Sequence, residues 1–159
     1  MRSRVVVLCA LLLGTVLLCP LTVLKVCSPA GDVVLQRPLP PNGQFELHYT
    51  HSWDKTPVQE VFASDEDGSL MLVEERYLWM GAGLDFHPSA QLDFSGDMVR
   101  VLAPRRLGIL HLAVATVANQ RLVFGREEVP LTSLAQPGTK LTLQLKKASV
   151  LAVLSGLIP

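Results

Sequence analysis

The chain has 159 residues, 49% of them hydrophobic, and its 14 basic residues balance 14 acidic ones. This length suits one domain, and the apolar excess is concentrated at the N-terminus. Without Arg2, Arg4 and Lys25, 11 basic residues remain against 14 acidic ones. We therefore expect no nucleic-acid partner, because nucleic-acid phosphates require a basic surface stripe.

The first predicted element is a hydrophobic helix. Val5 to Leu24 form a run of 20 residues without a charge, preceded by Arg2 and Arg4 and followed by Lys25. A helix of this length can cross a hydrocarbon core of about 30 Å. The excess of positive charge before the run places the N-terminus in the cytoplasm and the rest of the chain outside it. We predict a signal peptide or transmembrane anchor over residues 1–30 and an exported β-domain over residues 31–159.

Cleavage and permanent anchoring both stay open. Cys27, Ser28 and Ala30 are small enough for a cleavage site, but Pro29 crowds it and the apolar run exceeds a usual signal core. A lipid-modified cysteine is not predicted, because no small residues precede Cys19 or Cys27. All three cysteines lie within or beside this segment, so we expect no disulfide framework in the exported domain.

The remainder of the chain has the pattern of strands and turns. Leu141, Leu143 and Leu145 alternate with polar residues, which is typical of a strand with one buried face. Strands of the same kind are expected at Val33–Leu35, Gln44–Trp53, Val58–Ala63, Leu70–Met80, Ala90–Phe94, Met98–Leu102, Ile109–Val117 and Arg121–Phe124. The sequence predicts an all-β fold, an antiparallel β-sandwich or partly open barrel, after one N-terminal hydrophobic helix.

The separators between these strands suit tight hairpins. Residues 65–68 and 95–97 supply glycine for positive φ, and residues 118–120 supply asparagine. One helical turn is expected at Leu131–Leu134. The apolar tail from Val150 to Pro159 is too short to span a bilayer, and we expect it to pack on the domain or on a partner.

The strand expected at Gln44–Trp53 carries candidate site residues. In a regular strand, Tyr49, His51 and Trp53 share one face while His48 and Ser52 share the other. The two histidines then point in opposite directions, so we predict no metal site from this pair.

Two interpretations of His51 stay open. In one, His51 is a buried histidine satisfied by backbone or by a carboxylate such as Glu60 across a hairpin. In the other, His51, Ser52, Lys55 and Glu60 converge at one end of the sheet and bind a carboxylate or a partner loop. A hydrolase would need Ser52 presented on a nucleophile elbow, which the sequence lacks, so no enzymatic activity is predicted.

A later Gly81-Ala82-Gly83 is expected to permit a tight crossing after the strand that ends at Met80. No helix follows to make it a phosphate site. Trp53 and Trp79 are expected to be core or interface anchors.

Three elements in this order resemble the bacterial domain-of-unknown-function family 1850: Tyr49-Thr50-His51-Ser52, Lys55-x-Pro57-Val58-x-Glu60 and Gly81-Ala82-Gly83. The resemblance extends from Phe45 to Leu145. It implies a non-enzymatic accessory protein of a TAXI-type TRAP solute uptake system, because genes of this family are typically encoded beside such transporters. The implied partners are the TRAP permease and the periplasmic solute-binding protein, and the implied location is the bacterial cell envelope, anchored in the inner membrane or periplasmic.

The candidate binding or interface residues are His48, Tyr49, His51, Ser52, Trp53, Lys55, Glu60, Gly81 and Gly83. We expect no cofactor. The alternative is an envelope protein that binds a ligand or metal with the same residues.

Overall fold

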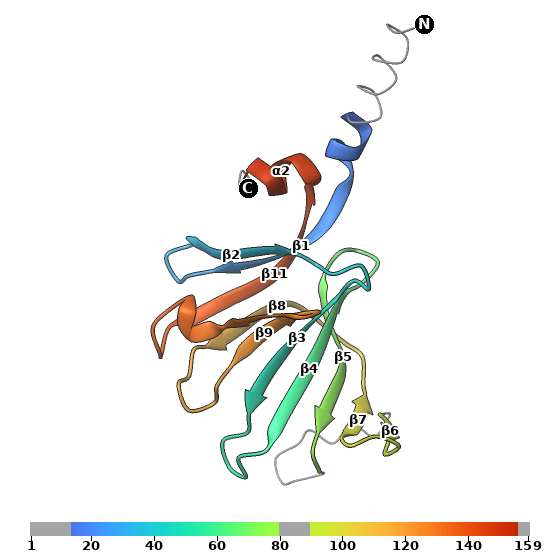
Figure 1. Ribbon diagram of the computed structural model, residues 1–159, viewed down its shortest axis with the longest axis vertical. Coiled ribbons are helices and arrows are strands. Elements are labelled where there is room, and N and C mark those ends of the chain that lie inside the picture. The colour runs from blue at the N-terminus through green and yellow to red at the C-terminus, as the bar shows by residue number, and fades with distance from the viewer. Residues whose placement is uncertain (1–13, 80–89, 156–159) are drawn as a thin grey trace, which may run out of the picture.

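The computed structural model describes residues 14–79 and 90–155. Eleven strands within these residues form one antiparallel sheet that curls into a half-barrel (Figure 1). They are β1 (Pro20–Cys27), β2 (Val33–Pro38), β3 (Gln44–Thr50), β4 (Pro57–Ser64), β5 (Leu70–Tyr77), β6 (Gln91–Asp93), β7 (Val99–Leu102), β8 (Arg105–Ala113), β9 (Arg121–Phe124), β10 (Glu127–Pro130) and β11 (Lys140–Ser149). A 3-10 turn, η1 (Leu131–Ser133), and a short helix, α2 (Val150–Ser155), complete the described elements.

The strand order is β10-β9-β3-β4-β5-β8-β11-β1-β2, with β7 paired to β5 and β6 paired to β7. The two edge strands of this path approach each other across the open side. Arg37 Nε on β2 donates to Glu127 Oε1 on β10 at 3.3 Å. This exposed ion pair links the edges of the half-barrel.

The core lies inside the half-barrel. Phe45 stacks on Phe62 with ring centroids 5.2 Å apart and on Phe124 at 5.9 Å. Leu24 and Leu143, from the other half of the sheet, are completely buried in the same cluster. This cluster therefore joins the two halves of the sheet. Burying one such side chain stabilises the fold by about 1.5–3 kcal/mol. The predicted all-β, partly open barrel is confirmed.

The helix predicted from Val5 to Leu24 is wrong at its C-terminal end. Residues 14–18 are helical, but Pro20 begins β1. Proline lacks the N–H that a continuing helix needs, and its ring clashes with the preceding turn. The β-branched Thr22, Val23 and Val26 then favour a strand.

Strand β1 is an integral part of the sheet. It pairs with β11 from Pro20↔Ser149 to Cys27↔Thr142, and its other edge pairs with β2. Val23, Leu24 and Val26 are fully buried. Among the described residues, no helix has the length and apolar character to cross a membrane.

Several strand boundaries differ from the sequence prediction. Strand β3 ends at Thr50 rather than at Trp53, and β8 begins at Arg105 and ends at Ala113 rather than at Val117. Strand β10 was not predicted. The turn at residues 118–120 does not join paired strands, because β8 pairs with β5 and β11 while β9 pairs with β3 and β10.

The turn predictions are confirmed in part. Gly68 has φ 83° in the hairpin between β4 and β5, as predicted. Asn119 has the expected positive φ of 46°, but its turn does not form a hairpin, and Gly96 does not have positive φ. The helical turn expected near Leu131 is η1. Cys27 is buried and Cys19 is exposed, and both are free thiols.

Candidate functional site

The residues predicted to form one site separate into three places. Because β3 ends at Thr50, the side chains from His51 to Lys55 lie in the turn between β3 and β4. Tyr49 and Glu60 lie on the inner face of the sheet, and His48 lies on the outer face. Gly81 and Gly83 lie outside the described residues.

The β3–β4 turn is organised around Asp54. His51 Nδ1 lies 2.9 Å from Asp54 Oδ1, and Thr56 Oγ1 donates to the same oxygen at 2.8 Å. The hydrogen bonds from Thr56 hold the pKa of Asp54 below its usual value. The carboxylate partner of His51 is therefore Asp54 and not Glu60, the one that we expected.

Lys55 and Ser52 support the same turn. Lys55 has φ 61°, a left-handed conformation, and its Nζ donates to the carbonyl oxygen of Ser52 at 2.5 Å. Trp53 is 84% exposed. The turn therefore presents an indole ring to solvent while its polar groups bond one another, and the expected convergence of His51, Ser52 and Lys55 with Glu60 does not occur.

A polar cluster lies inside one half of the barrel, and we call it the inner cluster. Tyr49 Oη donates to Glu60 Oε1 at 3.0 Å, and Tyr77 Oη donates to Glu75 Oε1 at 2.9 Å. Glu60 and Glu75 are register partners on β4 and β5, and Arg105 donates to Glu75 Oε1 at 3.3 Å. Two carboxylates, two phenols and one guanidinium thus share the inner face.

Burial governs the electrostatics of the inner cluster. Desolvation is the main reason that the pKa of Glu60 is raised, and the negative charge of Glu75 adds to it. Hydrogen bonding from Tyr49 and the positive charge of Arg105 act in the opposite direction. The pKa values of Tyr49 and Tyr77 are raised well above their usual value, first by burial, so both phenols stay protonated donors.

Glu75, Tyr77 and Arg105 were not predicted as site residues. The reason is a bulge in β5. Phe62 pairs with Leu72 and Val61 pairs with Glu74, so Val73 is an extra residue on β5. The extra residue reverses the alternation of inward and outward side chains along β5. Glu75 and Tyr77 therefore point inward, where a regular strand would direct Glu74 and Arg76. Two adjacent glutamates directly after the apolar residues 70–73 were the available signal.

The outer face carries an ion-pair network. Arg100 binds both oxygens of Glu74 at 2.8 Å, and Arg76 Nε binds Glu74 Oε1 at 2.5 Å. These bonds lower the pKa of Glu74 to about 2. Arg76 also reaches Glu46, whose other oxygen lies 2.6 Å from His48 Nε2. His48 therefore belongs to a network that stabilises the outer face of β3, β5 and β7.

Large apolar side chains surround the end of the half-barrel opposite α2, and we call this set the rim. Its members come from the β3–β4 turn, from the residues after β5, from β6 with the residue that follows it, and from the β8–β9 loop (Figure 1). The loop lies beside β3, because Thr50 N donates to Ala118 O at 2.7 Å. The rim residues, with their exposure, are Trp53 (84%), Leu78 (50%), Trp79 (53%), Leu92 (43%), Phe94 (64%) and Val117 (75%).

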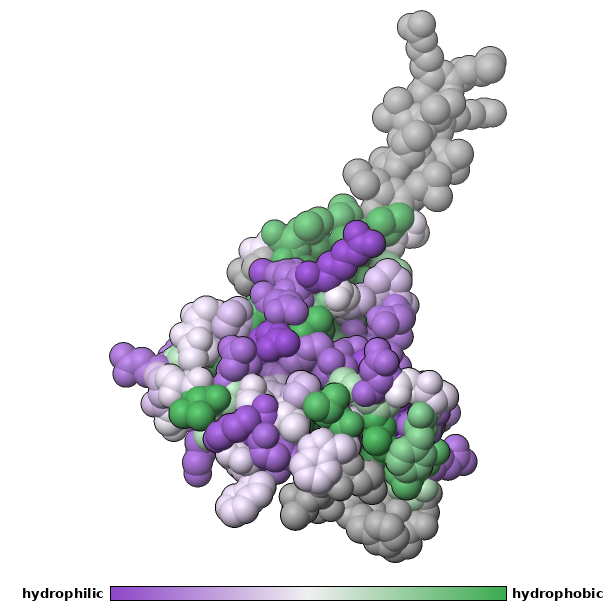
Figure 2. Space-filling model, turned by 60° about the horizontal axis from the view of Figure 1, so that its bottom comes forward, coloured by the Kyte–Doolittle hydropathy of each residue, from purple (hydrophilic) through white to green (hydrophobic). Residues whose placement is uncertain are grey.

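Figure 2 brings this end of the molecule forward and shows hydrophobic residues between hydrophilic ones. Aromatic side chains such as tryptophan and phenylalanine are enriched on surfaces that bind other proteins. Trp53 and Trp79 were expected to be core or interface anchors. Neither lies in the core, so only the role as interface anchors stays a prediction.

The polar side chains of the inner cluster are bonded to one another. Across residues 14–79 and 90–155, no three histidine, cysteine or acidic side chains are grouped so that they could hold a metal ion. In the inner cluster, each phenol donates to a carboxylate, and Arg105 donates to one of the carboxylates. The rim, by contrast, displays six large apolar side chains to solvent.

Comparison with curated proteins and with solved structures gave no match. One family model, a domain of unknown function (DUF1850), matches residues 45–131. The match covers more than half of the chain and runs from β3, through the inner cluster and the ranges that contain the rim, to η1. The chain therefore belongs to the DUF1850 family.

Proposed function

We propose that this protein is a non-enzymatic accessory subunit of a TAXI-type TRAP solute uptake system. It is associated with the membrane, faces outward, and binds the permease or the periplasmic solute-binding protein through the rim. The proposal starts from membership of the DUF1850 family, whose genes we expect beside such transporters.

The observation that carries the proposal is the rim itself. Tryptophan supplies a large apolar area with few rotatable bonds, and it is enriched among the residues that dominate binding energy. Trp53 and Trp79 stand 84% and 53% exposed on neighbouring loops. An isolated domain gains nothing in stability from such exposure, so we infer that a partner covers these rings.

The position of the rim fits an outward-facing partner. Residues 14–18, which end the apolar run predicted to enter the membrane, lie at the opposite end of the half-barrel from the rim (Figure 1). The rim therefore points away from the membrane in the proposed orientation. A periplasmic solute-binding protein would meet this end directly.

The alternative is a ligand-binding envelope protein that uses the inner cluster. The buried carboxylates and phenols favour it, because ligand sites commonly contain a few convergent polar groups. The described hydrogen bonds weaken it, because Tyr49 is bonded to Glu60 and Tyr77 to Glu75. We therefore place the inner cluster second.

Replacing Trp53 with alanine tests the proposal. The full-length tagged protein is purified in mild detergent from native membranes, and co-purifying proteins are identified by mass spectrometry. A buried interface tryptophan contributes about 2 kcal/mol or more, so Trp53→Ala is expected to weaken the complex more than tenfold. The fold is expected to persist, because Trp53 makes few contacts within the domain.

Ile109→Ala is the matched control, since Ile109 is 51% exposed on β8 and lies outside the rim. It is expected to leave recovery of the partner unchanged. Failure of the wild-type protein to recover any TRAP component would contradict the proposal. Recovery of a stoichiometric small molecule in place of a protein would favour the inner-cluster alternative.

A further inference from the structure

The short C-terminal helix α2 is apolar and lies outside the core. None of its residues is buried, and Leu151 and Leu154 are 50% and 74% exposed. The sequence carries no charged residue from Ala148 to Pro159. The tail was expected to pack on the domain or on a partner, and no residue of its described part is buried on the domain.

The sheet fixes α2 beside the N-terminal helical residues. Pro20 pairs with Ser149, and Val150 N donates to Cys19 O at 3.1 Å. Residues 14–18 precede this contact, and their Val16 and Leu18 are 59% and 70% exposed. We call Val16, Leu18, Leu151 and Leu154 the apolar end.

The half of the sheet that contains β1 and β11 has no acidic residue within its strands. Strands β1, β2, β8 and β11 contain no acidic residue, and their basic residues are Lys25, Arg37, Arg105, Arg106, Lys140, Lys146 and Lys147. The other strands contain seven acidic residues and three basic ones. The two halves of the sheet therefore differ in sign.

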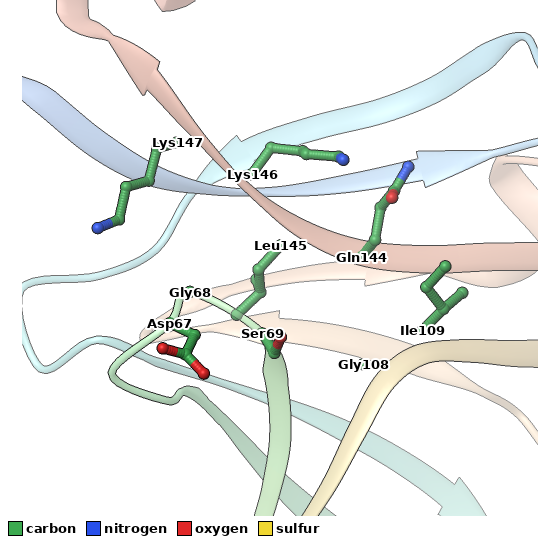
Figure 3. Close-up of a pocket in the computed structure, with 9 residues that line it drawn as sticks. All are labelled: Asp67, Gly68, Ser69, Gly108, Ile109, Gln144, Leu145, Lys146 and Lys147. Carbon is green, nitrogen blue, oxygen red and sulfur yellow. The ribbon is translucent and has the colours of Figure 1, made fainter.

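The lysines nearest the apolar end are not neutralised. Lys146 and Lys147 line a pocket of about 400 Å³ together with Asp67, and they extend from β11 in different directions (Figure 3). Asp67 is bound by Arg106 at 3.1 Å, and Arg106 also binds Asp65 at 3.1 Å. Within the described residues, neither lysine side chain has a hydrogen bond or an ion pair.

Lys25 adds positive charge to the face of the sheet that carries Lys146. It lies opposite Gln144 in the register, so it shares the outer face of the sheet with Lys146. Lys147 precedes the first residue of α2 by three residues, which is roughly 10 Å along a strand. The headgroup layer of a bilayer is about 5–8 Å thick on each side, so flexible lysine side chains can reach its phosphates when α2 rests below it.

We propose that the apolar end is a membrane footing, in which α2 inserts into the interface of a bilayer that contains anionic phospholipid and the lysines bind lipid phosphates. A bilayer fits better than a protein for two reasons. The apolar end continues the charge-free N-terminal run. In addition, Asp65 and Asp67 beside the lysines are paired with Arg106, whereas the side chains of Lys146 and Lys147 have no ion pair within the described residues, so they are available to anionic headgroups. The footing does not require the transporter and goes beyond the proposed function.

Tryptophan quenching by brominated lipid tests the footing. Leu154→Trp is introduced into full-length protein that also carries Trp53→Phe and Trp79→Phe, so position 154 holds the only tryptophan. The protein is reconstituted into vesicles with brominated acyl chains, made of phosphatidylcholine alone or of equal parts phosphatidylcholine and phosphatidylglycerol. We expect quenching in the mixed vesicles. A protein that keeps only the native Trp53 reports the rim and is expected to show none.

Lysine variants test the charge component. Combined Lys146→Gln and Lys147→Gln is expected to lower the ratio of quenched to unquenched tryptophan by roughly tenfold or more in mixed vesicles, since each lysine near an anionic surface contributes appreciably. Lys140→Gln, at the other end of β11, is the matched control and is expected to have no effect.

Absence of quenching at position 154 in both vesicle types would overturn the inference. Equal quenching in both types, unchanged by the lysine variants, would also overturn it, because the footing requires anionic lipid. The vesicles contain no transporter, so a failure here is distinguishable from a failure of the partner to co-purify.

Discussion

Replacing Leu24 with alanine is expected to lower the free energy of unfolding by about 2–5 kcal/mol. Leu24 is completely buried in the core cluster, opposite Leu145 of β11. Alanine leaves a cavity between the two halves of the half-barrel, and the surrounding strands can close it only in part. Urea denaturation followed by circular dichroism, in a detergent that keeps the full chain soluble, measures the change.

Lys25→Ala is the control for this prediction. The lysine is the next residue on β1, but its side chain lies on the outer face, so the change is expected within about 0.5 kcal/mol. Similar small effects at both positions would contradict the assignment of β1 to the core. Since β1 pairs with β11 and β2, we also expect residues 20–27 to stay attached to the folded domain.

Replacing Arg105 with methionine is expected to destabilise the protein by about 2–3 kcal/mol at pH 7. The guanidinium donates to Glu75, which is buried next to Glu60. Methionine keeps apolar contacts but leaves two neighbouring carboxylates without this cation. Breaking a buried ion pair on one side is costly because the remaining charge is uncompensated.

The loss of unfolding free energy caused by Arg105→Met is expected to become smaller as the pH is lowered. The pKa of Glu60 is raised in the folded state, so the folded chain binds this proton more tightly than the unfolded chain does. As the pH falls through the folded pKa of Glu60 toward the ordinary value of 4.5, Glu60 becomes protonated. Its repulsion with Glu75 is then relieved, and the variant loses less stability. Urea denaturation of the variant and the wild type at pH 7 and at pH 4.5 measures this difference.

Arg37→Met provides the comparison for the inner cluster. Arg37 and Glu127 form an ion pair whose side chains are 46% and 54% exposed, so its removal is expected to cost no more than about 1 kcal/mol, independently of Glu60. An equal cost for both arginines, or a cost at Arg105 that grows on acidification, would contradict the electrostatic account of the inner cluster.

Much of the fold followed from local patterns in the sequence. The alternation of Leu141, Leu143 and Leu145 placed β11 correctly, and the residues at 65–68 form the β4–β5 turn with Gly68 at positive φ. These features depend on neighbouring residues alone. Strand β1 was missed because its residues continue an apolar run, and hydrophobicity by itself does not distinguish a buried strand from the end of a membrane helix. Pro20 was the overlooked signal.

The candidate site was harder to predict because it depends on long-range register. Tyr49 and Glu60 were singled out, but their mutual hydrogen bond requires the β3–β4 pairing to be known. Glu75 faces inward only because β5 carries an extra residue at Val73, and Arg105 comes from a strand outside the motif. An early end to β3 moved His51 and Trp53 into a turn. One-residue changes of this kind are not encoded in spacing alone.

Photo-crosslinking from position 53 would test the proposed accessory role most directly. A photoreactive phenylalanine analogue replaces Trp53 in the full-length protein in native membranes, and the cross-linked products are identified by mass spectrometry after illumination. The same analogue at Ile109 reports the surface outside the rim. We predict that position 53, and not position 109, forms a cross-link to the solute-binding protein or the permease of a TAXI-type TRAP system. The absence of a transporter component among the products from position 53, or equal capture from both positions, would contradict the account.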